Sequence, residues 1–180
     1  MTYNTEDKKI ESDRYNKRAK KMLESNGLLN IDKSNELFDR NTHGKYKAYH
    51  RKYIKSSSIV LEIGAGTGRL TKTLLESGAI VVATDISPSS LNVIEKRYSK
   101  YNNSLIAQLA DMEQLPFKQN HFDIVSSAGS LSYGDNKIVM KEIYRVLKPG
   151  GLFICVDSLN DNPIYKFNRW IAYKMGKRSL

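Results

Sequence analysis

Cysteine is nearly absent from this sequence, which has one, Cys155, among 180 residues. A single cysteine excludes an intramolecular disulfide, and its place inside an apolar run predicts a core residue in a cytoplasmic protein. Long apolar runs are absent as well, because none approaches the ~20 residues that a membrane span needs. The first residues are polar and charged, so we expect no signal peptide. These absences predict a cytoplasmic protein without a transmembrane segment.

Basic residues are concentrated toward the two ends of the chain, whose net charge is +10. Residues 1–55 carry 14 Lys and Arg against 8 Asp and Glu, residues 56–155 carry 10 against 9, and residues 156–180 carry 5 against 2. Basic flanks suit an anionic substrate or a membrane surface. More often they are the solvated faces of helices, and the neutral middle gives no reason to expect a nucleic-acid partner.

Two common phosphate-binding motifs are missing from the glycine-rich stretch over residues 62–69. The dinucleotide fingerprint G-x-G-x-x-G needs a third glycine where Arg69 or Thr71 stands. The P-loop motif G-x-x-x-x-G-K-[ST] needs a glycine at position 69 too. The sequence has instead an acidic residue followed by three glycines at every second position. This spacing counts against an oxidoreductase that uses NAD.

The chain around these glycines is predicted to form a strand, a turn and a helix. Residues 59–63 are apolar and partly β-branched apart from Glu62, the composition of a buried parallel strand. After the glycines, leucines follow at helical spacing until Gly78, which is placed as a C-cap. Glycine lets the backbone approach a ligand closely because no Cβ intervenes. The stretch therefore predicts a ligand site at the start of a helix.

Strands and helices alternate through the rest of the middle region. One helix is expected to begin at Pro88 and another to span residues 137–147. Strands are expected over 80–84, 105–110, 122–127 and 152–156. This alternation predicts an α/β fold: a doubly wound, mostly parallel Rossmann-like sheet of about five strands with helices on both faces.

The first 55 residues are predicted to form a helical extension. It precedes a ligand-binding domain over 56–157 and a tail over 158–180. The expected helices are one over 14–25 capped by Asp13, one beginning after Asp32 or Ser34, and one over 45–55 with an apolar stripe of Tyr46, Tyr49, Tyr53 and Ile54.

Polar residues follow three of the predicted strands directly. Asp85 ends the second strand, Asp111 and Met112 end the third, and Ser127 lies at the end of the fourth. Open α/β sheets bind ligands at the carboxyl ends of their strands, so these side chains are expected to share one site. A carboxylate at position 85 suits two ribose hydroxyls, and Asp111 with Met112 suits the amino edge and the face of an adenine.

The motif from Glu62 to Gly68 resembles the first motif of the class I S-adenosylmethionine-dependent methyltransferases. Residues 110–117 and 145–151 are similar to two further segments of that family, and the resemblance covers about residues 55–157. It implies S-adenosylmethionine as the cofactor and a small-molecule methyl acceptor. In the family the glycine turn packs against the amino-acid part of the cofactor. The candidate cofactor-binding residues are therefore Glu62, Gly64, Ala65, Gly66, Gly68, Asp85, Ile86, Asp111, Met112 and Ser127.

Helices before the first strand help to close the site in this family, so Tyr15 and Tyr46 are expected either to reach the cofactor or to pack in the core. His43 and His50 lie in the N-terminal helical region that could face the site, where either could serve as a general base, but each is more often a surface or packing histidine. His121 precedes the fourth strand and is expected at the opposite end from the site. We assign no catalytic residue and no metal ligand. The remaining alternatives are an NAD-dependent oxidoreductase and a non-catalytic nucleotide-binding or scaffold module. A nucleic-acid methyltransferase is disfavoured because no N-P-P-Y-type motif follows the fourth strand.

The end of the chain departs from the family pattern. Family members continue past the fifth strand with a helix and two more strands, for which the 24 residues after Val156 are too few. Either the chain is a fragment or the sheet ends at five strands with an apolar edge. The tail over 162–180 is predicted to be an amphipathic helix that caps the sheet, pairs two copies in a homodimer or lies on a membrane surface.

Overall fold

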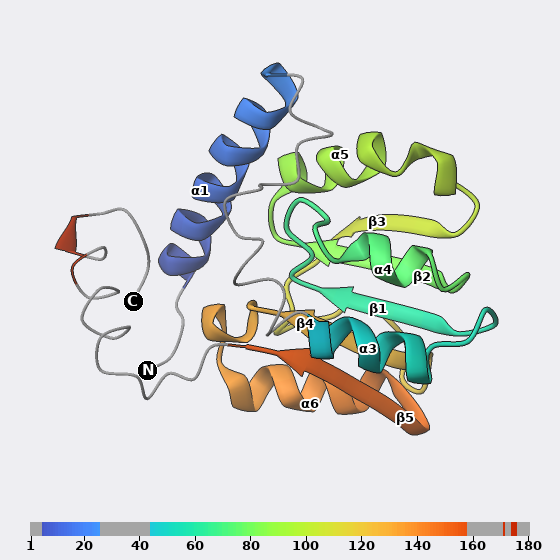
Figure 1. Ribbon diagram of the computed structural model, residues 1–180. Helices are drawn as coiled ribbons and strands as arrows, with labels where there is room; N and C mark the ends of the chain where they lie inside the picture. The colour runs from blue at the N-terminus through green and yellow to red at the C-terminus, as the bar shows by residue number, and fades with distance from the viewer. Residues whose placement is uncertain (1–4, 26–43, 158–170, 172–173, 176–180) are drawn as a thin grey trace.

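The computed structural model describes residues 5–25, 44–157, 171 and 174–175. Its centre is a five-stranded parallel sheet in the order β3-β2-β1-β4-β5 (Figure 1). The strands are β1 (Ile59–Ile63), β2 (Ile80–Asp85), β3 (Leu105–Leu109), β4 (Phe122–Ala128) and β5 (Leu147–Val156). The strand order reverses between β1 and β4, which is the point where such sheets bind ligands. The predicted doubly wound parallel sheet of five strands is confirmed.

Helices lie on both faces of the sheet (Figure 1). They are α1 (Thr5–Glu24), α3 (Gly44–Tyr53), α4 (Thr71–Leu75), α5 (Pro88–Arg97) and α6 (Asn136–Val146), with short 3₁₀ helices η3 (Ser99–Tyr101) and η4 (Leu131–Tyr133). Pro88 takes the first position of α5, and the hydroxyl of Ser87 caps that helix by accepting a hydrogen bond from the Ser90 N–H at 3.1 Å. The carboxylate of Asp135 caps α6 in the same way.

Alternate residues of the central strands supply two separate cores. Val60 of β1 packs with side chains of α4 and α5, whereas Leu61 packs on the opposite face with side chains of α6. Both side chains are fully buried, and burial of an aliphatic side chain stabilises the fold by about 1.5–3 kcal/mol. Burial on both faces explains why β1 reads as an almost continuous apolar run.

The N-terminal helix is longer than the sequence suggested. It begins at Thr5, so Asp13 is an exposed residue within the helix and does not cap it. Glu6 and Asp7 occupy the first turn, where negative charge is favourable, and no glycine or proline interrupts the helix.

The apolar stripe predicted for α3 is also partly wrong. Tyr46, His50 and Ile54 are buried, whereas Tyr49 and Tyr53 are 53% and 39% exposed. The buried residues are spaced four apart, so the helix turns a histidine inward and two tyrosines outward. His50 is accommodated because its Nε2 lies 2.8 Å from the Ser126 hydroxyl.

Cys155 is exposed, which corrects the expectation that it lies in the core. It belongs to β5, an edge strand that begins at Leu147, five residues earlier than predicted, and so has less cover than an inner strand. The second predicted helix and the tail over 158–180 lie outside the described residues apart from positions 171, 174 and 175. No helix in the described ranges has the length and apolar character to cross a bilayer.

Candidate cofactor site

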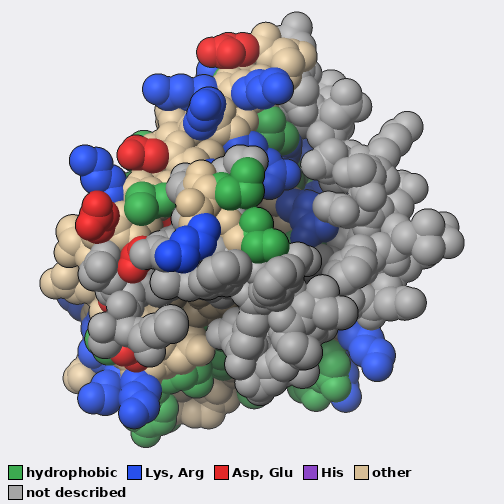
Figure 2. All heavy atoms as spheres, turned by 90° about the vertical axis from the view of Figure 1, so that its left-hand side faces the viewer, with side chains coloured by type: hydrophobic (Ala, Val, Ile, Leu, Met, Phe, Trp, Pro, Cys, Tyr) green, Lys and Arg blue, Asp and Glu red, His purple; other side chains and the backbone are tan. Residues whose placement is uncertain are grey.

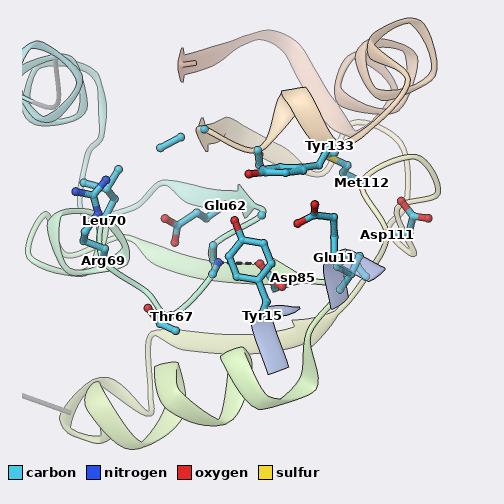
Figure 3. Close-up of a pocket in the computed structure, with 18 of the residues that line it drawn as sticks. Glu11, Tyr15, Glu62, Thr67, Arg69, Leu70, Asp85, Asp111, Met112 and Tyr133 are labelled. Carbon is cyan, nitrogen blue, oxygen red and sulfur yellow. Dashed lines mark hydrogen bonds between the residues drawn. The ribbon is translucent and has the colours of Figure 1, made fainter. Parts of the chain in front are cut away.

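A pocket of about 200 Å³ lies at the carboxyl ends of the inner strands, under α1 (Figure 3). Its floor is the turn after β1 and the ends of β2 and β3, and its far wall is the turn after β4. Residues Lys8, Glu11, Tyr15 and Arg18 of α1 line the side opposite the sheet. The pocket therefore joins segments that are separated by more than 100 positions in the sequence.

The three glycines of the turn after β1 have different surroundings. All three have positive φ angles, 62° for Gly64, 56° for Gly66 and 80° for Gly68. A Cβ on Gly64 would lie 2.3 Å from the Cβ of Ser130, and one on Gly68 would lie 2.9 Å from Ile94 and Tyr98. A Cβ on Gly66 would meet no atom within 4 Å. Gly64 and Gly68 are thus required for packing, while Gly66 leaves room for a ligand beside the backbone.

Asp85 connects the end of β2 to this turn. Its Oδ2 accepts a hydrogen bond from the Gly66 N–H at 2.8 Å (Figure 3), and its Oδ1 accepts one from the Ser87 N–H at 2.9 Å. Burial raises the pKa of this carboxyl, and the hydrogen bonds from backbone N–H groups oppose the rise. A carboxylate has about four lone-pair positions, so Asp85 can still accept hydrogen bonds from a diol.

Glu62 is a deeply buried carboxylate of the pocket, with 3% of its surface exposed. The hydroxyl of Thr71 donates a hydrogen bond to its Oε2 at 2.5 Å. Burial raises the pKa of Glu62 to about 7, and the charge of Asp85 adds to the rise. A buried carboxylate with few partners is suited to a cationic group of a ligand, which would offset its desolvation.

Glu62→Gln is expected to stabilise the ligand-free protein while weakening cofactor binding. The pKa of Glu62 is raised from 4.5 to about 7. The stabilisation that the protonated carboxyl gives to the fold is therefore complete below about pH 4.5 and is lost as the pH rises through 7. Glutamine does not ionise, so the variant buries no charge at this position at high pH. We expect its free energy of unfolding to exceed that of the unchanged protein by ~1–3 kcal/mol at about pH 8 and by less near pH 5.

Urea unfolding of both proteins at the two pH values measures this effect. Glu76→Gln is the control, because Glu76 is an exposed carboxylate at the C-cap of α4, 3.5 Å from Lys72. A stability difference that is the same at both pH values would contradict the raised pKa of Glu62.

Helix α1 is fixed over the pocket by polar contacts with two loops. The Lys8 Nζ lies 2.6 Å from both Asp111 and Glu113 in the loop after β3. The amide oxygen of Asn16 accepts hydrogen bonds from the Ser87 hydroxyl at 2.7 Å and from the Ser89 N–H at 3.2 Å. These contacts hold α1 against the end of the sheet that carries Asp85.

An aromatic pair closes the pocket between α1 and η4. The rings of Tyr15 and Tyr133 meet edge to face with centroids 6.2 Å apart (Figure 3). The guanidinium of Arg14 lies 4.7 Å from the centre of the Tyr15 ring and forms an ion pair with the buried Glu11 at 2.5 Å. Burial raises the pKa of Tyr15, so this hydroxyl stays protonated at neutral pH.

Eight of the ten candidate residues line the pocket: Glu62, Gly64, Ala65, Gly66, Asp85, Ile86, Asp111 and Met112. Gly68 does not, because it faces α5. Ser127 is buried behind the wall, where its hydroxyl lies 2.7 Å from that of Ser130, and Ser130 lines the pocket in its place.

Of the two tyrosines considered, Tyr15 reaches the pocket and Tyr46 does not. Tyr46 is buried, with its hydroxyl 2.5 Å from the hydroxyl of Ser126. His50 bonds the same serine, and burial lowers its pKa to about 4, so it is neutral at neutral pH. His121 precedes β4, at the opposite end of the strands from the pocket, and His43 lies outside the described residues.

Sequence reasoning missed the face of α1 that lines the pocket. Lys8, Glu11, Tyr15 and Arg18 are spaced by three, four and three residues, which places them on one side of a helix. The spacing is present in the sequence, but three of these four residues are charged, and an apolar stripe alone does not reveal them. No sequence pattern near Tyr133 predicts that it lines the pocket, because the turn after β4 places it there.

The parallel sheet with its switch point, together with a glycine turn and acidic strand ends around one pocket, defines a nucleotide-type cofactor site of a Rossmann-like protein. A family model described as a methyltransferase domain matches residues 61–155, more than half of the chain. The chain therefore belongs to the methyltransferase domain family, the class I S-adenosylmethionine-dependent methyltransferases.

Curated relatives agree with this membership. A ubiquinone/menaquinone biosynthesis C-methyltransferase of Neisseria gonorrhoeae is 36% identical over 146 residues, which are 76% of this chain and 57% of that protein. A demethylmenaquinone methyltransferase of Symbiobacterium thermophilum is 31% identical over 154 residues, 78% of this chain and 59% of that protein. The chain thus spans somewhat more than half the length of these relatives.

Solved structures show the same fold. A proposed S-adenosyl-L-methionine-dependent methyltransferase of Methanococcus maripaludis superimposes with a TM-score of 0.64 at 22% identity, covering 92% of this chain and 78% of that one. Geranyl diphosphate C-methyltransferase of Streptomyces coelicolor, in complex with S-adenosyl-L-homocysteine, has a TM-score of 0.63 at 18% identity and covers 73% of this chain and 51% of that one. At these identities the likeness concerns the fold alone.

Proposed function

We propose that this chain transfers a methyl group from S-adenosylmethionine to a small-molecule acceptor. The pocket beside Gly66 is the observation that carries the proposal. It combines an open backbone turn with the carboxylates of Glu62 and Asp85 and the apolar side chains of Ile86 and Met112. An amino-acid ammonium, a ribose and an adenine need these chemical partners, and here they follow one another along the strand ends.

The residues have separate proposed roles. Glu62 faces the ammonium of the cofactor, Asp85 accepts hydrogen bonds from the ribose hydroxyls, and Met112 packs against the adenine. The carboxylate of Asp111 already accepts hydrogen bonds from Lys8 and from the Glu113 N–H. We therefore assign Asp111 to fixing α1 and its own loop, and assign no direct contact with the adenine amino group to it.

The bound cofactor supplies a methyl group on a positively charged sulfur, which is a good leaving group. The task of the chain is then to align the acceptor and to exclude water, which accounts for much of the rate of such a displacement. Tyr15 and Tyr133 form an aromatic wall at the place where an acceptor enters. Tyr15 is protonated, so it donates a hydrogen bond to an acceptor oxygen and does not act as a base.

The names of the curated relatives support a small organic acceptor, since those proteins are named for quinone biosynthesis. We further propose that the protein acts in the cytoplasm, that residues 56–157 form the cofactor-binding domain, and that two copies associate through the β5 edge or the tail. The exposed Leu152 on that edge supports the last of these proposals.

Calorimetric titration of the full chain tests the choice of cofactor. S-adenosylhomocysteine is expected to bind, and NAD and NADP are expected to bind much more weakly or not at all, because the glycine spacing lacks the third glycine of the dinucleotide fingerprint. Tighter binding of NAD would favour an oxidoreductase. Binding of none of the three would favour a scaffold protein.

A further inference from the structure

Helix α3 presents an exposed basic surface that the cofactor site does not use. Its members, named the α3 patch here, are Lys45, Tyr49, Arg51, Lys52, Tyr53 and Lys55, and all six are exposed. Residues 44–55 contain no Asp or Glu. None of the four basic members forms an ion pair with another residue of the described ranges. Among the described residues, the positive charge of the patch is therefore not paired with an acidic side chain.

The two tyrosines give the α3 patch an aromatic component. Their rings are stacked, with centroids 6.0 Å apart and planes 10° from parallel, and the Lys52 Nζ lies 5.1 Å from the centre of the Tyr53 ring. Tyrosine combines an apolar ring with a polar hydroxyl, so it is enriched where proteins meet the head-group region of a bilayer. Outward-facing tyrosines among basic residues thus suit a lipid surface.

The face of the molecule around α1 is different. There Lys and Arg side chains alternate with Asp and Glu (Figure 2), and α1 itself contains Glu6, Asp7, Glu11, Asp13 and Glu24. Neighbouring charges of opposite sign partly cancel, and salt screens what remains beyond a Debye length of ~10 Å at 0.1 M. Helices α1, α5 and α6 each contain Asp or Glu among their basic residues, whereas α3 contains neither.

The position of α3 connects the patch with the cofactor site. Tyr46, in its first turn, bonds Ser126 in the carboxyl-terminal half of β4, so this helix begins near the end of the sheet that holds the pocket. The helix then runs back along the sheet toward the start of β1 (Figure 1). Its ten residues span ~15 Å. A surface bound along α3 would therefore reach the pocket end of the molecule.

We propose that the α3 patch docks the protein on an anionic lipid bilayer. Each Lys or Arg near an anionic membrane strengthens binding roughly five-fold, so the four exposed basic residues of the patch provide a measurable attraction. The exposed surface of a helix is convex and fits a deformable head-group layer. Nucleic acid is the competing polyanion, and the experiment distinguishes it.

The test is co-sedimentation of the full chain with phospholipid vesicles. Binding is expected to equimolar phosphatidylglycerol and phosphatidylcholine, to be weak with phosphatidylcholine alone, and to be lost at about 1 M salt, where the Debye length is ~3 Å. The variant K45E/R51E/K52E/K55E should bind the anionic vesicles at least ~10-fold more weakly. Y49S/Y53S should lose a smaller factor and keep the salt dependence.

The matched control is K96E/K118E/K137E/K141E, which makes the same change of net charge at exposed residues away from α3. It should bind close to the unchanged protein. The neutral variant K45Q/R51Q/K52Q/K55Q covers the case in which charge reversal disturbs folding, which circular dichroism reports. Equal losses in the control and the α3 variant would overturn the proposal, as would binding to both vesicle types alike.

A fluorescence titration with single-stranded oligouridylate tests the other polyanion. Tighter binding of the oligonucleotide than of anionic vesicles, sensitive to the same α3 variant, would assign the patch to nucleic acid and overturn the lipid proposal. Neither result depends on the titration with S-adenosylhomocysteine, so failure of the docking proposal and failure of the proposed methyl transfer remain distinguishable.

Discussion

Replacing Gly66 by valine is expected to abolish the binding of S-adenosylhomocysteine while the protein stays folded. A side chain at this position would project into open space of the pocket, since no atom lies within 4 Å of its Cβ. We expect the affinity to fall at least ~100-fold, because the valine would occupy the place where the backbone meets the ligand. Calorimetry with the purified variant measures the loss.

A valine at Gly150 serves as the matched control for the backbone strain that Gly66→Val introduces. Gly66 has a φ of 56°, and a β-branched residue is unfavourable there by about 1–2 kcal/mol. Gly150 has a φ of 77°, also has no atom within 4 Å of a Cβ, and does not line the pocket. Gly150→Val should therefore lose similar stability and keep its affinity. Normal affinity in Gly66→Val would show that the turn is structural only.

Asp85→Ala is expected to weaken the binding of S-adenosylhomocysteine by about 10- to 150-fold, which corresponds to ~1.5–3 kcal/mol for hydrogen bonds to a charged group. The loss has two physical sources. The ribose hydroxyls lose their acceptor, and the Gly66 N–H loses the carboxylate that holds the turn in place at 2.8 Å. Calorimetric titration of the folded variant gives the size of the effect.

Asp85→Asn helps to separate the loss of the ribose contact from the loss of the contact with the Gly66 N–H. Asparagine retains one oxygen that can accept a hydrogen bond from a backbone N–H, but it lacks the charge and the second oxygen that a diol needs. We expect it to keep more of the native stability than alanine and still to bind the cofactor weakly. If the folded alanine variant bound with unchanged affinity, Asp85 would have no part in holding the ribose.

The sequence carried enough information for the fold because its signals were local. The mostly apolar run of residues 59–63 is typical of a strand buried on both faces, and the alternation of such strands with helices leaves few arrangements besides a doubly wound parallel sheet. Glu62, Gly66 and Asp85 were predicted as site residues for the same reason. Glu62 lies next to the last residue of β1, Gly66 lies in the turn after it, and Asp85 ends β2. The carboxyl ends of parallel strands converge at one edge of the sheet.

The distinction among the glycines needed the tertiary structure. In the sequence Gly64, Gly66 and Gly68 are equivalent. In the structure Ser130 crowds Gly64, and Ile94 and Tyr98 crowd Gly68, so that of the three only Gly66 has open space where a side chain would project. The exposure of Cys155 likewise depends on the position of β5 at the edge of the sheet, which its apolar sequence does not reveal.

The amino-acid sequence by itself thus determined the sheet, the glycine turn and the acidic strand ends, because these follow from periodicity and from residue types at fixed spacings. Only the tertiary structure decided that α1 covers the site, that Lys8 engages Asp111, and that Tyr15 meets Tyr133 across the pocket. Residues 8 and 111, like residues 15 and 133, are more than 100 positions apart. Which side chains meet over such separations depends on how whole helices pack against the end of the sheet, and local sequence patterns do not encode that packing.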